Sequence, residues 1–215
     1  ATALKDARML DRHIHPRLKP LLHRCVSIID KPAITPDGLT LVGFAIGVLA
    51  LPFLALGWYL AALAVIVLNR LFDGLDGALA RRRGLTDAGG FLDITLDFLF
   101  YALVPFGFML ADPAANSLAG GWLLFAFMGT GSSFLAFAAL AAKHQIDNPG
   151  YAHKSFYYLG GLTEGTETIL LFVLGCLFPE YFAVMAWVFG ALCWMTTFTR
   201  IWSGYLTLKA VQRQE

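Results

Sequence analysis

The stretch at residues 73–97 reads DGLDGALARRRGLTDAGGFLDITLD, and the rest of the chain is organised around it. It holds two pairs of aspartates, Asp73 with Asp76 and Asp93 with Asp97, between strongly apolar flanks. Spacings of three and four residues place the carboxylates of each pair on one face of a helix. Carboxylates near lipid are costly and usually face a protein interior or a wet cavity, so all four are candidates for function.

The four acids predict a cation site that also receives phosphate. Neighbouring carboxylates repel one another unless an opposite charge neutralises them, and a hard divalent cation bound through oxygen suits them. Gly77 lets a ligand approach the helix backbone, and Arg81 offers a guanidinium to a phosphate oxygen. Gly89 lies one turn before Asp93 and clears a similar space on the second helix.

The composition is that of a membrane protein. Of the 215 residues, 58% are hydrophobic and 14% are charged, which is too apolar for an ordinary soluble domain. The net charge of +1 gives no indication of a nucleic-acid partner. The three cysteines form no close motif, so they indicate neither a disulfide framework nor a zinc site.

Residues 1–38 are the polar part of the chain. Their basic residues alternate with apolar ones, which predicts a basic amphipathic helix on the membrane surface, with a solvated basic arm as the alternative. The segment TPDGLT at residues 35–40 then opens the first membrane span, and either Asp37 or Thr40 is a candidate helix cap.

Six apolar segments follow, each near the ~20 residues that a helix needs to cross a bilayer. The predicted spans are 39–57, 58–80, 89–111, 119–142, 155–178 and 181–206. The sequence therefore predicts an all-α integral membrane protein with six transmembrane helices. Its two parts are the N-terminal arm, 1–38, and the membrane domain, 39–215.

The basic residues predict the orientation. With six spans, every loop that contains Lys or Arg falls on the same side as both termini, and that side is cytoplasmic by the positive-inside rule. Both aspartate pairs then lie at the cytoplasmic ends of the second and third spans. We expect a multi-pass protein of a bacterial-type inner membrane, with its site facing the cytoplasm and in contact with membrane lipid.

The aspartate stretch closely resembles the signature of the CDP-alcohol phosphotransferases, an integral-membrane family. That signature is D-x-x-D-G-x-x-A-R, a short spacer, and G-x-x-x-D-x-x-x-D. It falls on Asp73, Asp76, Gly77, Ala80, Arg81, Gly89, Asp93 and Asp97. The spacer of seven residues is one shorter than in the commonest family form, which is a difference of one residue in a loop. The TPDGLT segment is similar to the T-P-N-x-L-T that often precedes the first span in the family.

The resemblance implies an enzyme that transfers a phosphatidyl group from CDP-diacylglycerol to a small alcohol and releases CMP. It implies that Asp73, Asp76 and Asp93 bind one or two divalent ions, Mg²⁺ or Mn²⁺. It also implies that Asp97 is the general base and touches a second metal. Glycerol 3-phosphate, inositol or its phosphate, and serine are all acceptors within the family, whose members are often homodimers.

The same resemblance assigns the contacts with CDP to Gly77 and Arg81. Gly77 leaves space for CDP beside the helix, and Arg81 offers it a positive charge. Gly74 is a further candidate at a position that the signature does not specify.

A second polar group lies in the fifth and sixth spans. Glu164 and Glu167 lie one helical turn apart. They contact the acceptor alcohol, bind a cationic head group, or pair with a basic residue such as Arg70 or Arg200. Arg70 alternatively extends along the helix toward the membrane surface. Arg200 would suit an anionic acceptor. The basic residues that we group with it are His144, His153 and Lys154.

Two other functions compete with the transferase. One is a cation transporter or channel that uses the four acids, and the other is a non-catalytic lipid-binding protein. Ion pathways usually place such acids near the middle of the membrane, whereas here they lie at one boundary beside an arginine that repels cations.

Overall fold

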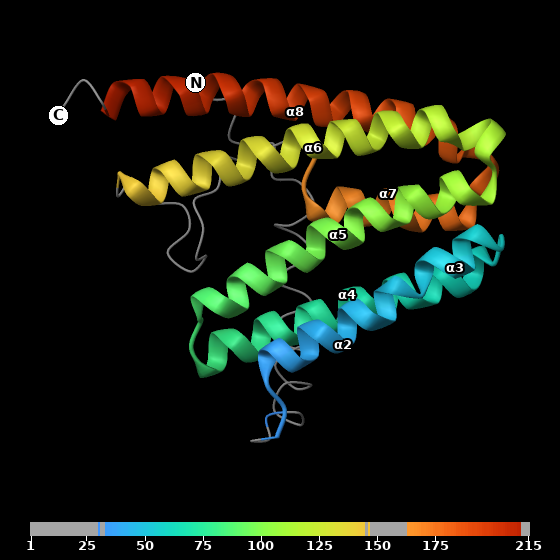
Figure 1. Cartoon of the computed structure of the whole chain (residues 1–215), viewed down its shortest axis with the longest axis horizontal. Coiled ribbons are helices and arrows are strands. Elements are labelled where there is room, and N and C mark those ends of the chain that lie inside the picture. Colours follow the sequence, from blue (N-terminus) through green and yellow to red (C-terminus); the bar gives the residue numbers. More distant parts are fainter. Residues whose placement is uncertain (1–29, 31–32, 145, 147–162, 212–215) are drawn as a thin grey trace.

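The computed structural model describes residues 30, 33–144, 146 and 163–211, and every regular element within them is a helix (Figure 1). The helices are α2 (Pro36–Val48), α3 (Ala50–Ala55), α4 (Tyr59–Arg83), α5 (Asp87–Ala111), α6 (Pro113–Lys143), α7 (Gly165–Leu177), the short 3₁₀ helix η1 (Pro179–Tyr181) and α8 (Phe182–Val211). The predicted all-α class is confirmed. The surface helix predicted before residue 30 lies outside the described residues, as do His153 and Lys154.

Among the described residues, four helical segments are long and apolar enough to cross a membrane. They are Pro36–Ala55, Asp87–Ala111, Pro113–Lys143 and Pro179–Val211. Helix α4 has the length, at 25 residues, but carries the charged site residues, and α7 has 13 residues within the described part of the chain. The membrane class is therefore supported, while the count of six spans stays a prediction.

The first helix begins and breaks where local chemistry requires it. Thr35 is its N-cap, since its hydroxyl accepts a hydrogen bond from the Gly38 N–H at 3.0 Å. The prediction of a cap at Asp37 or Thr40 is therefore wrong, because both residues lie inside the helix that Thr35 caps. The predicted span 39–57 is also divided at Leu49, because Pro52 lacks the N–H that would continue the α2 hydrogen-bond ladder.

The helices form a layered bundle (Figure 1). Helices α6 and α8 pack along each other, α2 packs on α4, and α5 contacts α2, α3 and α6. Gly57, with a φ of 72°, forms the tight turn between α3 and α4, because glycine adopts positive φ without a steric penalty.

The apolar core lies beyond the acids along α5. It contains Phe100, Val104 and Phe108, and the Phe108 ring stacks on Phe182 with centroids 4.1 Å apart. Asp93 and Asp97 precede this core on the same helix. The start of α5 is therefore polar, and its remainder holds the helix against α3, α4 and α7.

Candidate functional site

A three-residue connection between α4 and α5 brings the two aspartate pairs together. Gly84 ends α4 with a φ of 108°, which favours glycine, and the Thr86 hydroxyl caps α5 by accepting the Gly89 N–H at 3.1 Å. From this turn α5 runs back in the direction opposite to α4, and α2 packs against both helices, so the last turns of α4 face the first turns of α5.

Three carboxylates form a compact cluster at this position. Asp73, Asp76 and Asp93 each offer an oxygen, and these oxygens all lie within 4.8 Å of one another. Asp76 is 4% exposed, and one of its oxygens accepts a hydrogen bond from the Thr40 hydroxyl at 2.5 Å. Hard oxygen donors at this spacing suit a divalent cation, which would also relieve their mutual repulsion. The residues present therefore fit a metal site; we call them the aspartate triad.

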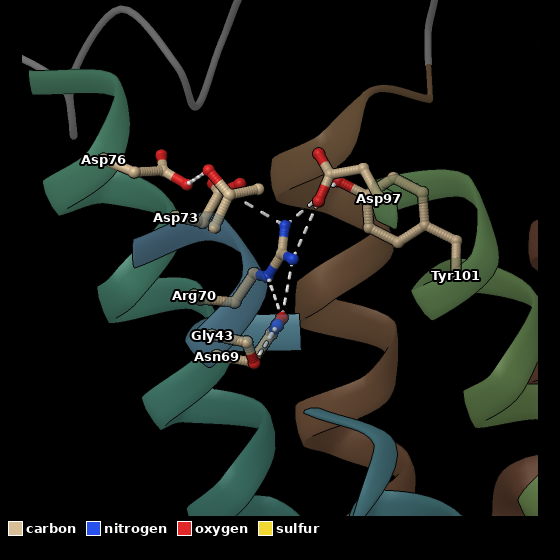
Figure 2. A network of polar contacts seen from close by, with 8 residues as sticks. Gly43, Asn69, Arg70, Asp73, Asp76, Asp97 and Tyr101 are labelled. Carbon is tan, nitrogen blue, oxygen red and sulfur yellow. Dashed lines mark hydrogen bonds and ion pairs between the residues drawn. The ribbon is translucent and has the colours of Figure 1, made fainter. Parts of the chain in front are cut away.

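Asp97 lies beside the triad but has a different partner. Its Oδ1 forms an ion pair with Nη2 of Arg70 at 2.8 Å, and Nη1 of the same guanidinium lies 3.7 Å from Oδ2 of Asp73 (Figure 2). Arg70 was expected either to pair with a glutamate or to extend toward the surface. The structure instead pairs it with aspartates, because its face of α4 is turned toward α5.

A cavity of about 560 Å³ opens next to the triad. Asp76, Gly77, Arg81 and Gly89 line it, together with the first turn of α2. A Cβ atom at Gly77 would lie 3.3 Å from Nη1 of Arg81, so glycine leaves the guanidinium room along the helix. Gly74 is half-buried and is not among the lining residues. We call this space the donor cavity.

A second cavity, of about 700 Å³, begins at Asp97. Its polar side includes Thr130, Glu164 and Arg200, and its apolar side is formed mainly by α5 and α6. Arg200 is 7% exposed, donates a hydrogen bond to the Thr130 carbonyl at 3.2 Å and lies over the Phe134 ring. We call this space the acceptor cavity, and both cavities are named for the substrates that we propose for them under Proposed function.

The two glutamates of the fifth predicted span form a helix cap. Glu164 and Glu167 build a capping box at the start of α7, in which the Glu167 carboxylate accepts the Glu164 N–H at 3.0 Å. Glu164 also lines the acceptor cavity. The structure thus gives Glu167 a structural function, and substrate contact by either residue stays a prediction.

Three residues of the site were missed by the sequence analysis. They are Thr40, which donates to Asp76, and Asn69 and Tyr101, which contact Arg70. The available signal for Asn69 was an amide inside an apolar run, next to an intramembrane arginine. Thr40 and Tyr101 contact partners on α4 from other helices, and Asn69 also contacts Gly43 on α2, so helical spacing alone does not reveal these contacts.

Fold and site together define a helical membrane protein with a partly buried carboxylate site next to two cavities. The sequence profile of the CDP-alcohol phosphatidyltransferases matches residues 33–202, and the chain belongs to this family. The predicted resemblance and the predicted enzyme class, a CDP-alcohol phosphatidyltransferase, are confirmed. The two alternatives, a cation transporter or channel and a non-catalytic lipid-binding protein, have no such support.

Relatives and solved structures agree with this assignment. The chain is 87% identical over 206 residues to inner membrane protein YnjF of Escherichia coli (strain K12), which covers 96% of this chain and 100% of that protein. It is 28% identical to archaetidylinositol phosphate synthase of Pyrococcus horikoshii, with 88% of this chain and 93% of that protein covered.

The fold is also that of Mycobacterium tuberculosis phosphatidylinositol phosphate synthase (PgsA1). The apo structure of that protein gives a TM-score of 0.64 at 23% identity and covers 86% of this chain and 95% of that one. PgsA1 has also been solved with CDP-DAG bound and with manganese and citrate. At this identity the likeness establishes the fold alone.

Proposed function

We propose that this protein transfers the phosphatidyl group of CDP-diacylglycerol to a small phosphorylated polyol and releases CMP, with one or two divalent ions bound. The observation that carries the proposal is that the acids lie next to both cavities. Asp76 and Asp93 of the triad line the cavity that contains Gly77 and Arg81, and Asp97, beside the triad, lines the cavity that contains Arg200.

The donor cavity suits the CDP group. Arg81 offers a planar set of donors to phosphate oxygens, and Gly77 and Gly89 keep side chains away from the helix backbone. The binding of CDP-DAG by PgsA1, which has the same fold, supports this choice of donor. Gly74, outside the cavity lining, would act only through the packing of α4.

The triad would hold the metal. Asp73, Asp76 and Asp93 supply carboxylate oxygens, and the complex of PgsA1 with manganese supports Mn²⁺ or Mg²⁺ as the ion. An ion held there would supply positive charge against the pyrophosphate and the departing CMP. Thr40 holds the Asp76 carboxylate in place by its hydrogen bond.

Asp97 would act as the general base. Its carboxylate takes the proton of the acceptor hydroxyl as the hydroxyl oxygen attacks the phosphorus of the phosphatidyl group. A new P–O bond forms, the P–O bond to CMP breaks, and CMP leaves with the electron pair. Arg81 stabilises the phosphate oxygens during this exchange.

The acceptor cavity favours an anionic acceptor. Arg200 is a buried cation on its wall, and Lys154, outside the described residues, is proposed to add a second positive charge. Glu164 also lines this cavity and would accept a hydrogen bond from a polyol hydroxyl, and Glu167 would support it through the helix cap. Inositol phosphate and glycerol 3-phosphate are the proposed acceptors, the first also supported by the archaetidylinositol phosphate synthases among the relatives.

The membrane arrangement belongs to the same proposal. Helices α4 and α7 would complete six spans in an inner membrane, the membrane that the name of the E. coli relative gives for that protein. The positive-inside rule would then place both termini and the site on the cytoplasmic side. The basic arm, 1–38, would lie on lipid phosphates, and two copies would form a homodimer. Cysteine labelling from each side of sealed inverted vesicles tests the orientation.

Release of CMP tests the reaction directly. Purified protein with CDP-diacylglycerol and Mg²⁺ is expected to release CMP with inositol phosphate or glycerol 3-phosphate, and the lipid product identifies the acceptor. Inositol, which is uncharged, and serine, which is zwitterionic, serve as control acceptors without a phosphate group. No release with any of the four would refute the proposed transfer, and release with serine alone would refute the anionic acceptor.

Replacement of Arg200 tests the acceptor cavity. Arg200→Gln is expected to raise the KM for the phosphorylated acceptor about 10- to 100-fold, because one charge-assisted contact contributes about 1.5–3 kcal/mol. The KM for CDP-diacylglycerol should stay unchanged. Lys209→Gln, on the same helix but outside the cavity lining, is the matched control. An unchanged acceptor KM in Arg200→Gln would remove Arg200 from this role.

A further inference from the structure

The end of α4 carries three consecutive arginines. Arg81, Arg82 and Arg83 lie in its last turn, and Arg81 and Arg83 line the donor cavity. The negative end of the helix dipole favours cations at this position, but adjacent like charges repel one another unless an acid lies among them. The proposed reaction gives a function to Arg81 alone.

Asp30 supplies such an acid from the chain that precedes α2. Its Oδ1 accepts hydrogen bonds from Nε and Nη2 of Arg83 at 2.9 and 2.6 Å, and its Oδ2 lies 3.0 Å from Nε of Arg82. One carboxylate thus binds two guanidinium groups. The side chains of Asp30 and Arg83 are 22% and 29% exposed, whereas that of Arg82 is 53% exposed. The pair with Arg83 is therefore the better protected from solvent screening.

Arg83 also binds the backbone that leads into α2. Its Nη1 donates a hydrogen bond to the Ile34 carbonyl at 2.5 Å. Ile34 directly precedes Thr35, which caps α2 and lines the donor cavity. A planar guanidinium that binds a carboxylate along one edge and a carbonyl at another N–H holds both in a defined geometry. We call Asp30, Arg83 and the Ile34 carbonyl the N-terminal clamp.

The clamp joins two walls of the donor cavity. One wall is the first turn of α2, and another is the end of α4 with the loop to α5. The chain connects α2 to α4 only through α3, at the opposite end of these helices (Figure 1). Beside the cavity, the spacing of the two walls therefore depends on packing and on polar contacts between the helices. These contacts include the clamp and the hydrogen bond from Thr40 to Asp76.

We infer that Asp30 is a positioning residue of the donor site, which acts through Arg83 to hold the first turn of α2 at the distance from α4 that the CDP group requires. This inference rests on the proposed function for the identity of the donor. Asp30 is not among the lining residues of the cavity, so it acts without touching the substrate. The two cavity arginines then differ in function, because Arg81 serves the phosphates and Arg83 sets the shape of the cavity.

Binding of CDP-diacylglycerol to Asp30→Asn in detergent tests the inference, because positioning and simple electrostatics predict opposite signs. CDP is anionic, so removal of a nearby carboxylate would tighten binding if Asp30 acted through its charge alone. Loss of the clamp should instead raise the Kd about three- to tenfold, as expected for a partly exposed charge-assisted contact. Asp30→Glu should recover most of the affinity. Unchanged or tighter binding in Asp30→Asn would overturn the inference.

A double-variant comparison identifies the partner of Asp30. Arg83→Gln is expected to raise the Kd by about the same factor as Asp30→Asn, and the double variant should bind no more weakly than Arg83→Gln, since both changes remove one contact. Additive losses would mean that Arg83 binds the donor phosphates independently of Asp30, and they would overturn the inference. Glu180→Gln, which changes an exposed carboxylate in η1 that lines neither cavity, is the matched control.

Kinetics separate a positioning role at the donor site from a general loss of structure. Asp30→Asn is expected to raise the KM for CDP-diacylglycerol about three- to tenfold, while kcat and the KM for the acceptor change less than about twofold. The acceptor cavity is formed by other helices and by parts of α5 that the clamp does not contact. A fall in kcat at unchanged donor KM would contradict the positioning of the donor by Asp30.

Amide hydrogen exchange gives a readout that needs neither turnover nor substrate. The N–H groups of Gly38 and Leu39 bind Thr35 at the start of α2. Asp30→Asn is expected to speed exchange in the peptide 33–40 about three- to tenfold and to leave α8 unchanged, because the clamp restrains only the start of α2. Equal exchange in both proteins would overturn the inference. If the wild type itself releases no CMP, the proposed function fails, while the exchange comparison still decides whether Asp30 holds α2.

Discussion

Replacement of Asp97 by asparagine is expected to lower the rate of CMP release about 10³-fold, which lies within the range that a positioned general base contributes. The amide occupies the same volume and can still accept a hydrogen bond from Arg70, so the change is confined to the loss of the proton acceptor. Binding of CDP-diacylglycerol should change less than about threefold, because Asp97 lines the acceptor cavity and not the donor cavity.

The measurement is single-turnover CMP release at saturating acceptor, together with equilibrium binding of CDP-diacylglycerol. Asp87→Asn is the matched control, since Asp87 lies in the first turn of the same helix and lines neither cavity. Normal turnover by Asp97→Asn would remove Asp97 from the role of base. Loss of donor binding together with turnover would indicate that Asp97 supports the donor site instead.

Removal of the metal is expected to have a comparably large effect. Treatment with EDTA should stop CMP release, and Mg²⁺ or Mn²⁺ should restore it, because the triad concentrates three carboxylates where the pyrophosphate would lie. Asp76→Asn should lower turnover more than about 10²-fold even at high Mg²⁺, since the amide is a weaker ligand and carries no charge. The Thr40 hydroxyl can still donate to the remaining carbonyl oxygen, which limits the structural disturbance.

Asp112→Asn is the control for this experiment, because Asp112 caps α6 far from the triad in sequence and lines neither cavity. Turnover that persists in EDTA would contradict a metal-dependent reaction. Equal metal affinity in Asp76→Asn and wild type, measured by Mn²⁺ binding, would remove Asp76 from the ligand set while leaving the other two acids to be tested in the same way.

The sequence predicted the helices well because their ends carry local signals. Gly57, Gly84 and Pro113 lie at turns, and the predicted limits of the spans fall within a few residues of the observed helices over most of the described chain. The division of the first span at Leu49 was missed, since a proline near the middle of an apolar run either kinks or breaks a helix.

The site was predicted from the sequence only in part. Helical spacing identifies which acids share a helix face, and it correctly grouped Asp73 with Asp76 and Asp93 with Asp97. It does not determine how α4 is rotated against α2 and α5, and that rotation decides that Asn69 contacts α2 and that Arg70 contacts Asp97. The sequence likewise indicates that Glu164 and Glu167 are intramembrane acids. The structure shows that α7 starts at Gly165, so the two glutamates cap a helix.

The wall between the two cavities has a consequence for the order of events. Ile94 and Phe134 line both cavities, so the donor and acceptor spaces meet across a single apolar partition next to the acids. If the cavities hold the two substrates as proposed, both substrates would be bound at once. The phosphatidyl group would then pass directly from donor to acceptor without a covalent intermediate on the protein. The kinetic mechanism would then be sequential, and the partition would exclude water that otherwise diverts the activated lipid to hydrolysis.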